Sequence, residues 1–187
     1  MWWRESTKSS GRLLRGAAAV AFAGLLSIGA GGCGFHPLYG PTASGADLSE
    51  VMKTVDVAGI PSRTGQRLRN ELIFGTTGGN APLPPVYRLD VALRETRRNA
   101  LVTSQGLPTG QVVQLDAEYR LVRLKDNETV FKAYSTAEAA FNLVGTTGLA
   151  GSTYGDVRAA IDAENRAARS LADTMKTRLA MFLSKDA

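Results

Sequence analysis

Three segments of the chain alternate between apolar and polar side chains, and this pattern constrains the fold more than any other feature. The segments are Val86–Glu95, Val113–Leu121 and Val130–Asn142. Successive side chains of a strand point to opposite faces, so the alternation predicts strands with one buried face and one polar face. A polar turn, Lys125–Glu128, joins the last two segments. We therefore expect an antiparallel meander with a single apolar face.

Two other segments have the period of an amphipathic helix. Ser62 is placed to cap a helix that ends near Gly75 and carries Leu68 and Leu72 four residues apart. Asp156–Leu183 predicts a long helix, because its apolar residues recur at spacings of three, four or seven and form one stripe. Each helix is expected to bury this face against the sheet.

A shorter alternating segment, Val51–Val57, predicts a first strand ahead of the first helix. The order of elements is then β-α-β-β-β-α. The expected fold class is α+β, a two-layer sandwich with two helices packed on one face of a four-stranded mixed sheet. The sheet is mixed because a helical connection places the first strand parallel to its neighbour.

The amino-terminal region has the pattern of a lipoprotein signal peptide. Gly16–Ala30 is uncharged and follows a segment with four basic residues and one acidic residue. Its 15 residues span roughly 22 Å as a helix, which is less than the ~30 Å hydrocarbon core of a membrane. Small residues then precede Cys33, the one cysteine. This predicts cleavage before Cys33 and lipidation of its thiol; an uncleaved anchor with an incidental cysteine is the alternative.

Three regions follow from this interpretation: a signal peptide at 1–32, a lipidated amino terminus and linker at 33–47, and a folded domain at 48–187. Removing residues 1–32 leaves 18 Lys and Arg against 16 Asp and Glu, a net charge of +2 in place of +5. The excess positive charge belongs mainly to the signal, which argues against a nucleic-acid partner.

No pattern of residues indicates catalysis or a metal. The single histidine, His36, lies three residues from Cys33 and has no second histidine to share a metal. Once Cys33 is lipidated, no thiol remains for a disulfide, a metal or a nucleophile. On these grounds alone an enzyme remains possible but has no support, and we expect no cofactor other than the covalent lipid at Cys33.

Two stretches of sequence resemble a known family. The string Cys33-Gly-Phe-His-Pro-Leu-Tyr-Gly40, the later Ile60-Pro-Ser-Arg-Thr-Gly-Gln-Arg-Leu-Arg-Asn-Glu-Leu72 and the order of elements are similar to LptE, a lipopolysaccharide-assembly lipoprotein, in its alphaproteobacterial form. The resemblance covers essentially the whole chain after the signal. Its most specific part is the Cys-Gly-Phe-x-Pro-Leu-Tyr start.

The resemblance implies a non-enzymatic partner of a membrane protein. It implies that the protein plugs the lumen of the LptD β-barrel, assists assembly of that barrel and contributes to lipopolysaccharide delivery. An outer-membrane location is implied as well, and Gly34 after the lipidated cysteine is compatible with that destination. The alternative is an auxiliary lipoprotein of a lipid-transport ABC system, which can share the same two-layer architecture.

Binding of lipopolysaccharide requires basic side chains, because this lipid carries phosphates and acidic sugars. Two sequence clusters provide them and are the candidate lipopolysaccharide-binding residues: Arg94, Arg97 and Arg98, and Arg120, Arg123 and Lys125. The clusters lie toward opposite ends of neighbouring strands, so they need not form one site. Each of these side chains is also typical of a solvated edge or a cross-strand ion pair.

Overall fold

The computed structural model describes Gly45, residues 47–143 and residues 152–186. The chain divides into a unit of residues 1–37 and a unit of residues 38–187, and every described residue belongs to the second unit. The predicted signal peptide, Cys33 and most of the predicted linker lie outside the described residues. None of the helices in the described part combines the length and apolarity needed to cross a membrane.

Seven elements follow one another along the described chain. They are α2 (Leu48–Lys53), β1 (Val55–Val57), α3 (Arg63–Thr77), β2 (Tyr87–Val102), β3 (Pro108–Arg123), β4 (Glu128–Asn142) and α4 (Ser152–Asp186). The strands form one sheet in the order β1-β2-β3-β4, with β1 parallel to β2 and the remaining pairs antiparallel. The predicted α+β fold with its four-stranded mixed sheet is confirmed.

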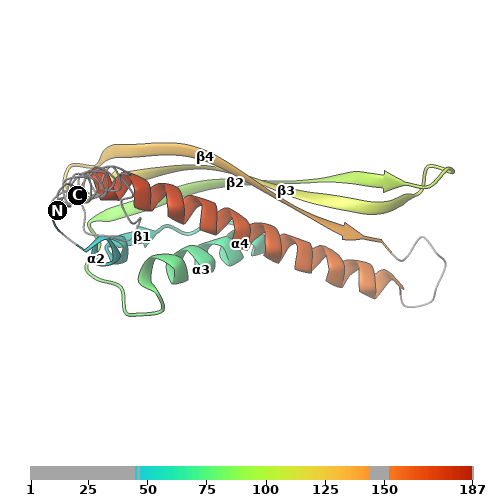
Figure 1. Ribbon diagram of the computed structural model, residues 1–187, viewed down its shortest axis with the longest axis horizontal. Helices are drawn as coiled ribbons and strands as arrows, with labels where there is room; N and C mark the ends of the chain where they lie inside the picture. The colour runs from blue at the N-terminus through green and yellow to red at the C-terminus, as the bar shows by residue number, and fades with distance from the viewer. Residues whose placement is uncertain (1–44, 46, 144–151, 187) are drawn as a thin grey trace, which may run out of the picture. The chain divides into compact units, whose positions relative to one another are not determined.

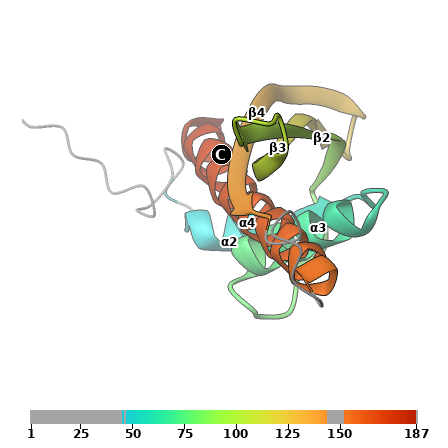
Figure 2. The same cartoon turned by 90° about the vertical axis from the view of Figure 1, so that its right-hand side faces the viewer.

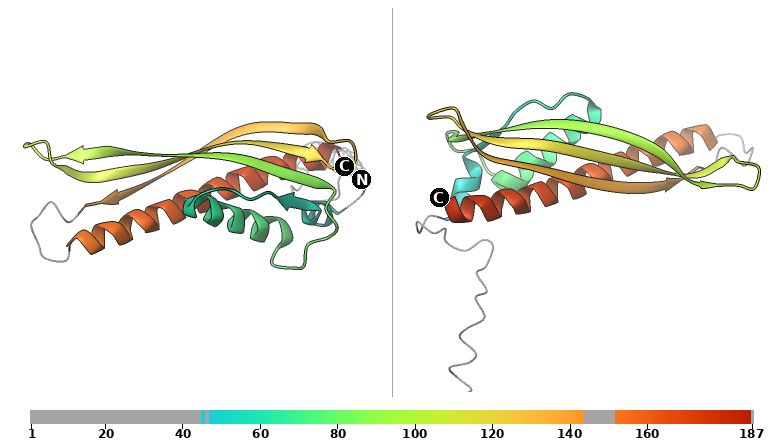
Figure 3. Two further views of the ribbon diagram at one scale, coloured as in Figure 1. Left: turned by 180° about the vertical axis from the view of Figure 1, so that it is seen from behind. Right: turned by 90° about the horizontal axis from the view of Figure 1, so that it is seen from above.

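The helices cover one face of this sheet. Figures 1 and 3 show α4 running along the sheet, with α3 beside α4 and close to β1. Viewed end-on, the helices lie on one side of the strands (Figure 2). The residues that the alternation predicted to point inward form the core together with the helix stripes; among them are Leu89, Leu115, Leu121, Leu68, Leu72, Leu171, Met175, Leu179 and Leu183.

Local signals account for where the helices begin and end. Ser62 caps α3, because its hydroxyl accepts a hydrogen bond from the N–H of Gly65 at 3.1 Å. The helix ends at Gly78, which adopts the left-handed conformation that glycine tolerates best. It therefore continues beyond Gly75, where the sequence analysis placed its end. Gly75 instead lies inside the helix, against Lys176 of α4.

The predicted first strand was too long. Residues 51–53 belong to α2, and only Val55–Val57 pair with β2. Asp47 caps α2 by accepting from the N–H of Ser49 at 2.8 Å, and the buried Leu48 and Met52 are spaced four apart on its inner face. The same residues fit both a helical and an alternating pattern. The helix forms because it buries two large side chains.

The ends of β2 and α4 also extend further than the sequence analysis predicted. β2 continues to Val102, and α4 begins at Ser152. Val157 was predicted in the apolar stripe of α4 but is 52% exposed. Figure 1 shows the cause, since the start of α4 projects beyond α3 and has one layer fewer to pack against.

Gly65 provides a test of the packing between α3 and the segment before it. A Cβ at Gly65 would lie 2.7 Å from Cγ2 of Ile60 and 3.1 Å from the Ile60 carbonyl oxygen. We expect Gly65→Ala to lower the free energy of unfolding by about 1–2 kcal/mol, because overpacking outweighs the gain of about 1 kcal/mol in helix propensity. Urea denaturation of the domain at residues 48–187 measures this change.

Gly75→Ala is the matched control within the same helix. A Cβ there would lie 3.2 Å from Cδ of Lys176, a flexible side chain that can move aside. We expect this variant to be unchanged or more stable by up to about 1 kcal/mol. A Gly65→Ala variant as stable as Gly75→Ala would contradict the packing that the structure shows.

Candidate functional site

On the uncovered face of the sheet, acidic and basic side chains form ion pairs with one another. Residues in register across β2, β3 and β4 form rows, one of which contains Asp90, Arg120 and Lys132. Asp90 accepts hydrogen bonds from Nε of Arg88 at 2.9 Å and from Nε of Arg120 at 3.1 Å. Opposite charges side by side stabilise such a face and leave it nearly neutral.

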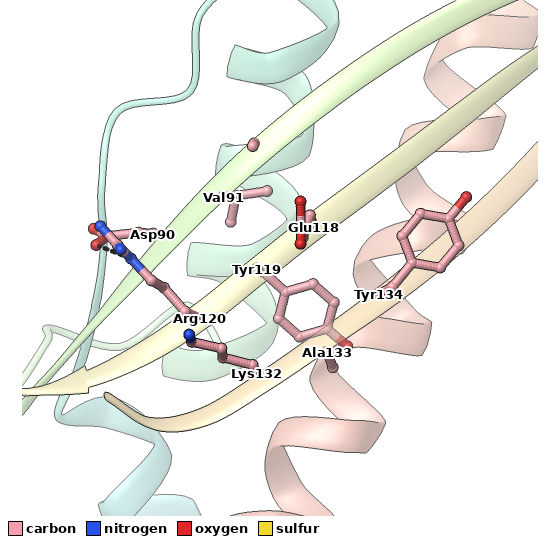
Figure 4. Close-up of a pocket in the computed structure, with 9 residues that line it drawn as sticks. Asp90, Val91, Glu118, Tyr119, Arg120, Lys132, Ala133 and Tyr134 are labelled. Atoms are coloured by element: carbon pink, nitrogen blue, oxygen red, sulfur yellow. Dashed lines mark hydrogen bonds and ion pairs between the residues drawn. The ribbon is translucent and has the colours of Figure 1, made fainter. Parts of the chain in front are cut away.

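A shallow hollow of about 640 Å³ lies in this part of the sheet. Two acidic and two basic side chains line it, so it carries no net charge. Figure 4 shows Arg120 reaching Asp90, with Lys132 beside Arg120 on the next strand. The residues around the hollow are Asp90, Val91, Ala92, Glu118, Tyr119, Arg120, Lys132, Ala133 and Tyr134.

The charge balance of Asp90 follows from its two arginines. Partial burial by itself would raise the pKa of the Asp90 carboxyl. The hydrogen bonds from Arg88 and Arg120, together with their positive charges, outweigh burial and hold the pKa below its ordinary value. Asp90 therefore stays ionised at neutral pH and keeps Arg120 in place along the hollow.

A second carboxylate on this face is held by a tyrosine. The hydroxyl of Tyr134 donates to Oδ1 of Asp116 at 2.6 Å, and Nε2 of Gln114 donates to the same carboxylate. The Tyr134 hydrogen bond, followed by that of Gln114, lowers the pKa of Asp116. The same bond raises the pKa of Tyr134, because loss of its proton would leave two anions in contact. Arg94 faces Asp116 in register and lowers the pKa of that carboxyl further.

The first basic cluster from the sequence is divided between the two faces of the sheet. Arg94 and Arg98 lie on the uncovered face, and both nitrogen-to-oxygen contacts of Arg98 go to Glu138, at 2.9 and 2.8 Å. Arg97 points to the helix side, where it forms ion pairs with Glu95 and with Glu164 of α4. Arg97 is thus placed away from its two sequence neighbours.

Glu164 connects three elements beneath the sheet. It is 4% exposed and forms ion pairs with Arg63 at the start of α3 and with Arg97 on β2. Close by, the hydroxyl of Thr64 donates to Glu95 at 2.9 Å. A buried carboxylate needs such partners, because an unpaired buried charge is strongly destabilising. Arg97 consequently has a structural role in joining β2 to α4.

The second basic cluster lies at the other end of the meander. Arg120 lines the hollow, whereas Arg123 bonds Asp126 at 3.1 Å in the β3–β4 turn. Lys125 is exposed in the same turn. Arg98 is in register with Val112, eleven residues along β3 from Arg123, or roughly 36 Å at 3.3 Å per residue. The six predicted residues therefore do not form a single site.

Sequence reasoning missed the role of Glu164, although a signal was present. Glu164 occupies a position in the apolar stripe of α4, next to Ala163 and three and four residues before Ala167 and Ala168. An acidic residue within such a stripe indicates a buried ion pair. Its partner Arg97 is 67 residues away in the chain, and no local pattern connects the two.

Metal binding has no support from the described part of the chain, where no group of three or more His, Cys, Asp or Glu side chains is placed to hold an ion. The chemistry offered by the uncovered face is hydrogen bonding and ion pairing. Such a face suits contact with water, with polar side chains or with an anionic group between Arg120 and Lys132.

The bond between Tyr134 and Asp116 predicts a measurable pH effect. The pKa of Asp116 is lowered in the folded state, so this carboxylate contributes stability that is present above its unfolded pKa of about 3.9 and lost as the pH falls through the folded value. We expect Tyr134→Phe to raise the pKa of Asp116 toward its ordinary value. Titration followed by carboxyl ¹³C chemical shifts measures this.

Asp126 is the internal control for that titration. Its pKa is lowered mainly by the backbone N–H of Glu128, in the β3–β4 turn. The pKa of Asp126 should be the same in Tyr134→Phe and in the unchanged protein. An Asp116 pKa that does not move in the variant would show that the Tyr134 hydroxyl is not its main partner.

Comparison with known proteins places the chain in a family. Residues 52–179 match the model of the LptE lipopolysaccharide-assembly family. A comparison with curated protein sequences finds no match. Among solved structures, a protein of Caulobacter crescentus described as a lipoprotein has a TM-score of 0.58 at 18% identity, covering 73% of this chain and 96% of that one.

Two further solved structures are more distant. A minor lipoprotein of Acinetobacter baumannii has a TM-score of 0.49 at 14% identity, covering 70% of this chain and 94% of that one. Rare lipoprotein B of Shewanella oneidensis has a TM-score of 0.44 at 11% identity, covering 68% and 96%. The Caulobacter structure shares the fold, and the family model spans most of the described domain. This chain belongs to the LptE lipopolysaccharide-assembly family.

Proposed function

We propose that this protein is an outer-membrane lipoprotein that assists assembly of an LptD-type β-barrel, plugs the lumen of that barrel and contributes to lipopolysaccharide delivery to the cell surface. Membership of the LptE family over residues 52–179 is the observation that carries this proposal. The role is non-enzymatic and consists of binding.

The uncovered face of the sheet supports the plug. Barrel interiors that hold water or a plug are polar, so a domain inside one must present hydrogen-bonding groups with little net charge. The rows of Asp90 with Arg120 and of Arg94 with Asp116 fit that requirement. Their charges cancel locally, and their polar atoms remain able to exchange partners with a lumen wall.

The proposed anchor is a lipid on Cys33. Residues 34–47 could span roughly 45 Å when extended, which separates the domain from the membrane surface. At about 0.8 kcal/mol per buried CH₂, two or more acyl chains make attachment stable. Of this segment, Gly45 and Asp47, the cap of α2, are among the described residues.

For lipopolysaccharide we propose the hollow as the contact, with Arg120 as its principal residue among the six candidates. Arg120 and Lys132 are directly in register on β3 and β4, so two cations lie side by side in a concave surface. A phosphate between them would accept hydrogen bonds from both side chains. Arg97 is the least suited of the six, because it lies on the helix side of the sheet, where it pairs with Glu95 and the buried Glu164.

The test is affinity purification of the lipidated protein from detergent-solubilised outer membranes. We expect an LptD-type barrel and lipopolysaccharide to co-purify. The double variant Arg120→Gln, Lys132→Gln should still co-purify with the barrel, but the amount of lipopolysaccharide that co-purifies should fall several-fold. The control Arg158→Gln, Lys185→Gln removes the same charge from exposed positions at the two ends of α4 and should retain both.

Other outcomes of the same purification would contradict the proposal. Recovery of an inner-membrane permease in place of a barrel would favour the auxiliary lipoprotein of a lipid-transport ABC system. Recovery of the protein without any partner would contradict the proposed role as a plug of the barrel. Equal lipopolysaccharide in the double variant and the control would exclude the hollow as the contact.

A further inference from the structure

The hollow on the uncovered face contains two charged side chains without partners. In the described part of the chain, Glu118 and Lys132 form no ion pair and no side-chain hydrogen bond. The other carboxylates on this part of the face, Asp90, Asp116 and Glu138, all bond neighbouring side chains. Glu118 therefore keeps its acceptor oxygens, and Lys132 its donors, for a group from outside the chain.

An aromatic ring borders the same hollow. Tyr134 is directly in register with Glu118 on the neighbouring strand. Its hydroxyl donates to Asp116 of β3 at 2.6 Å, which fixes where the ring lies, and the side chain remains 55% exposed. An exposed and fixed aromatic ring offers an apolar surface. The hollow thus combines this surface with a free carboxylate and a free ammonium group.

The cations lie toward one end of the hollow and the aromatic ring toward the other. Arg120 and Lys132 are in register with each other, and the row of Glu118 and Tyr134 lies two residues away along each strand. At about 3.3 Å per residue, the two rows are roughly 7 Å apart. Figure 4 shows Glu118 between Arg120 and Tyr134. A fitting ligand therefore carries an anionic group, hydroxyl groups and an apolar patch within this short length.

We propose that the hollow binds a phosphorylated pyranose. The phosphate accepts hydrogen bonds from Arg120 and Lys132. A sugar hydroxyl donates to Glu118, and the C–H bonds on one face of the sugar ring pack on Tyr134. The inference rests on the lipopolysaccharide contact proposed above and extends it from the phosphate to the sugar that carries it.

Glu118 is the residue that distinguishes this ligand from a simple anion. A sugar hydroxyl beside Glu118 donates a hydrogen bond to it, whereas inorganic phosphate brings mainly like charge to the same place. An acidic peptide is a poorer occupant as well, because its carboxylates supply no donor for Glu118. A site that bonds a hydroxyl group discriminates strongly against a ligand without one. The hollow should therefore prefer the phosphorylated sugar to its separate parts.

The test is an NMR titration of the detergent-solubilised, lipidated protein, followed by the amide chemical shifts of Glu118, Arg120 and Lys132. The ligands are α-D-glucose 1-phosphate, inorganic phosphate and glucose. We expect glucose 1-phosphate to bind at least tenfold more tightly than either of the other two. Deacylated lipopolysaccharide identifies the source of the sugar, because it should displace glucose 1-phosphate at a lower concentration if the natural ligand is the lipid.

Glu118→Gln should change the affinities for two of these ligands in opposite directions. We expect weaker binding of glucose 1-phosphate, at least fivefold, because an acceptor for the hydroxyl is lost. Inorganic phosphate should bind more tightly, because a like charge is removed. Glu138→Gln is the matched control, since it removes the same charge from the same face outside the hollow. It should change both affinities less than twofold.

Two variants of Tyr134 separate its ring from its hydroxyl. Tyr134→Ala removes the apolar surface and should weaken binding of glucose 1-phosphate at least tenfold. Tyr134→Phe keeps the ring and should weaken it no more than threefold. Phe74→Ala removes a 66% exposed aromatic ring from α3 and should leave the affinity unchanged.

Three results would overturn the inference: equal affinities for glucose 1-phosphate and inorganic phosphate, tighter binding of both ligands in Glu118→Gln, or unchanged binding in Tyr134→Ala. If Tyr134→Ala does not fold, the opposite shifts in Glu118→Gln decide. Phosphate binding without preference for the sugar would leave the phosphate contact of the proposed function standing. Loss of the barrel in purification, with the sugar preference intact, would count against the proposed function alone.

Discussion

The contact between α4 and one face of the sheet is the constraint on which the rest of the structure depends. Leu171, Met175, Leu179 and Leu183 of α4 are fully buried against the apolar side of the strands. Each such side chain contributes about 1.5–3 kcal/mol when fully buried. Because this one helix and α3 lie on the same face, the opposite face has no cover and must be polar.

The same helix also determines how the edges and the interior charges are arranged. Glu164 forms ion pairs with Arg63 and Arg97 beneath the sheet. Arg166 and Arg178 donate hydrogen bonds to carbonyls on the outer edge of β4. The helix α4 thus supplies buried apolar side chains to the core, the carboxylate of the buried ion pairs and hydrogen bonds to two carbonyls of β4. A shift of α4 along the sheet would break all three, so its register is fixed by more than apolar packing.

Much of the fold could be predicted because its signals are local. The two-residue period of β2, β3 and β4 identified the buried faces, and Ser62 identified the start of α3. The helix α2 was missed because its two buried residues, Leu48 and Met52, overlap a short alternating run. The end of α3 was misplaced because two glycines, Gly75 and Gly78, each suit a helix end.

The candidate site was harder to predict, because it depends on contacts between distant segments. The alternation of β2 already implies that Arg97 faces away from Arg94 and Arg98, but its partner Glu164 lies on another element. The hollow at Arg120 and Lys132 depends on the register between strands, which the sequence does not specify. The short length of β1 could not be predicted either, because the pattern of residues 51–57 suits a strand while residues 51–53 belong to α2.

The central claim is that the uncovered, polar face of the sheet is the surface that this protein presents to its partner. Hydroxyl-radical footprinting of the isolated protein and of the complex proposed with an LptD-type barrel tests the claim most directly. Tyr134 is a suitable reporter, because it lies on that face and is 55% exposed in the isolated domain. The account predicts that Tyr134 is oxidised several-fold more slowly in the complex. Equal oxidation of Tyr134 in the two samples would contradict the account.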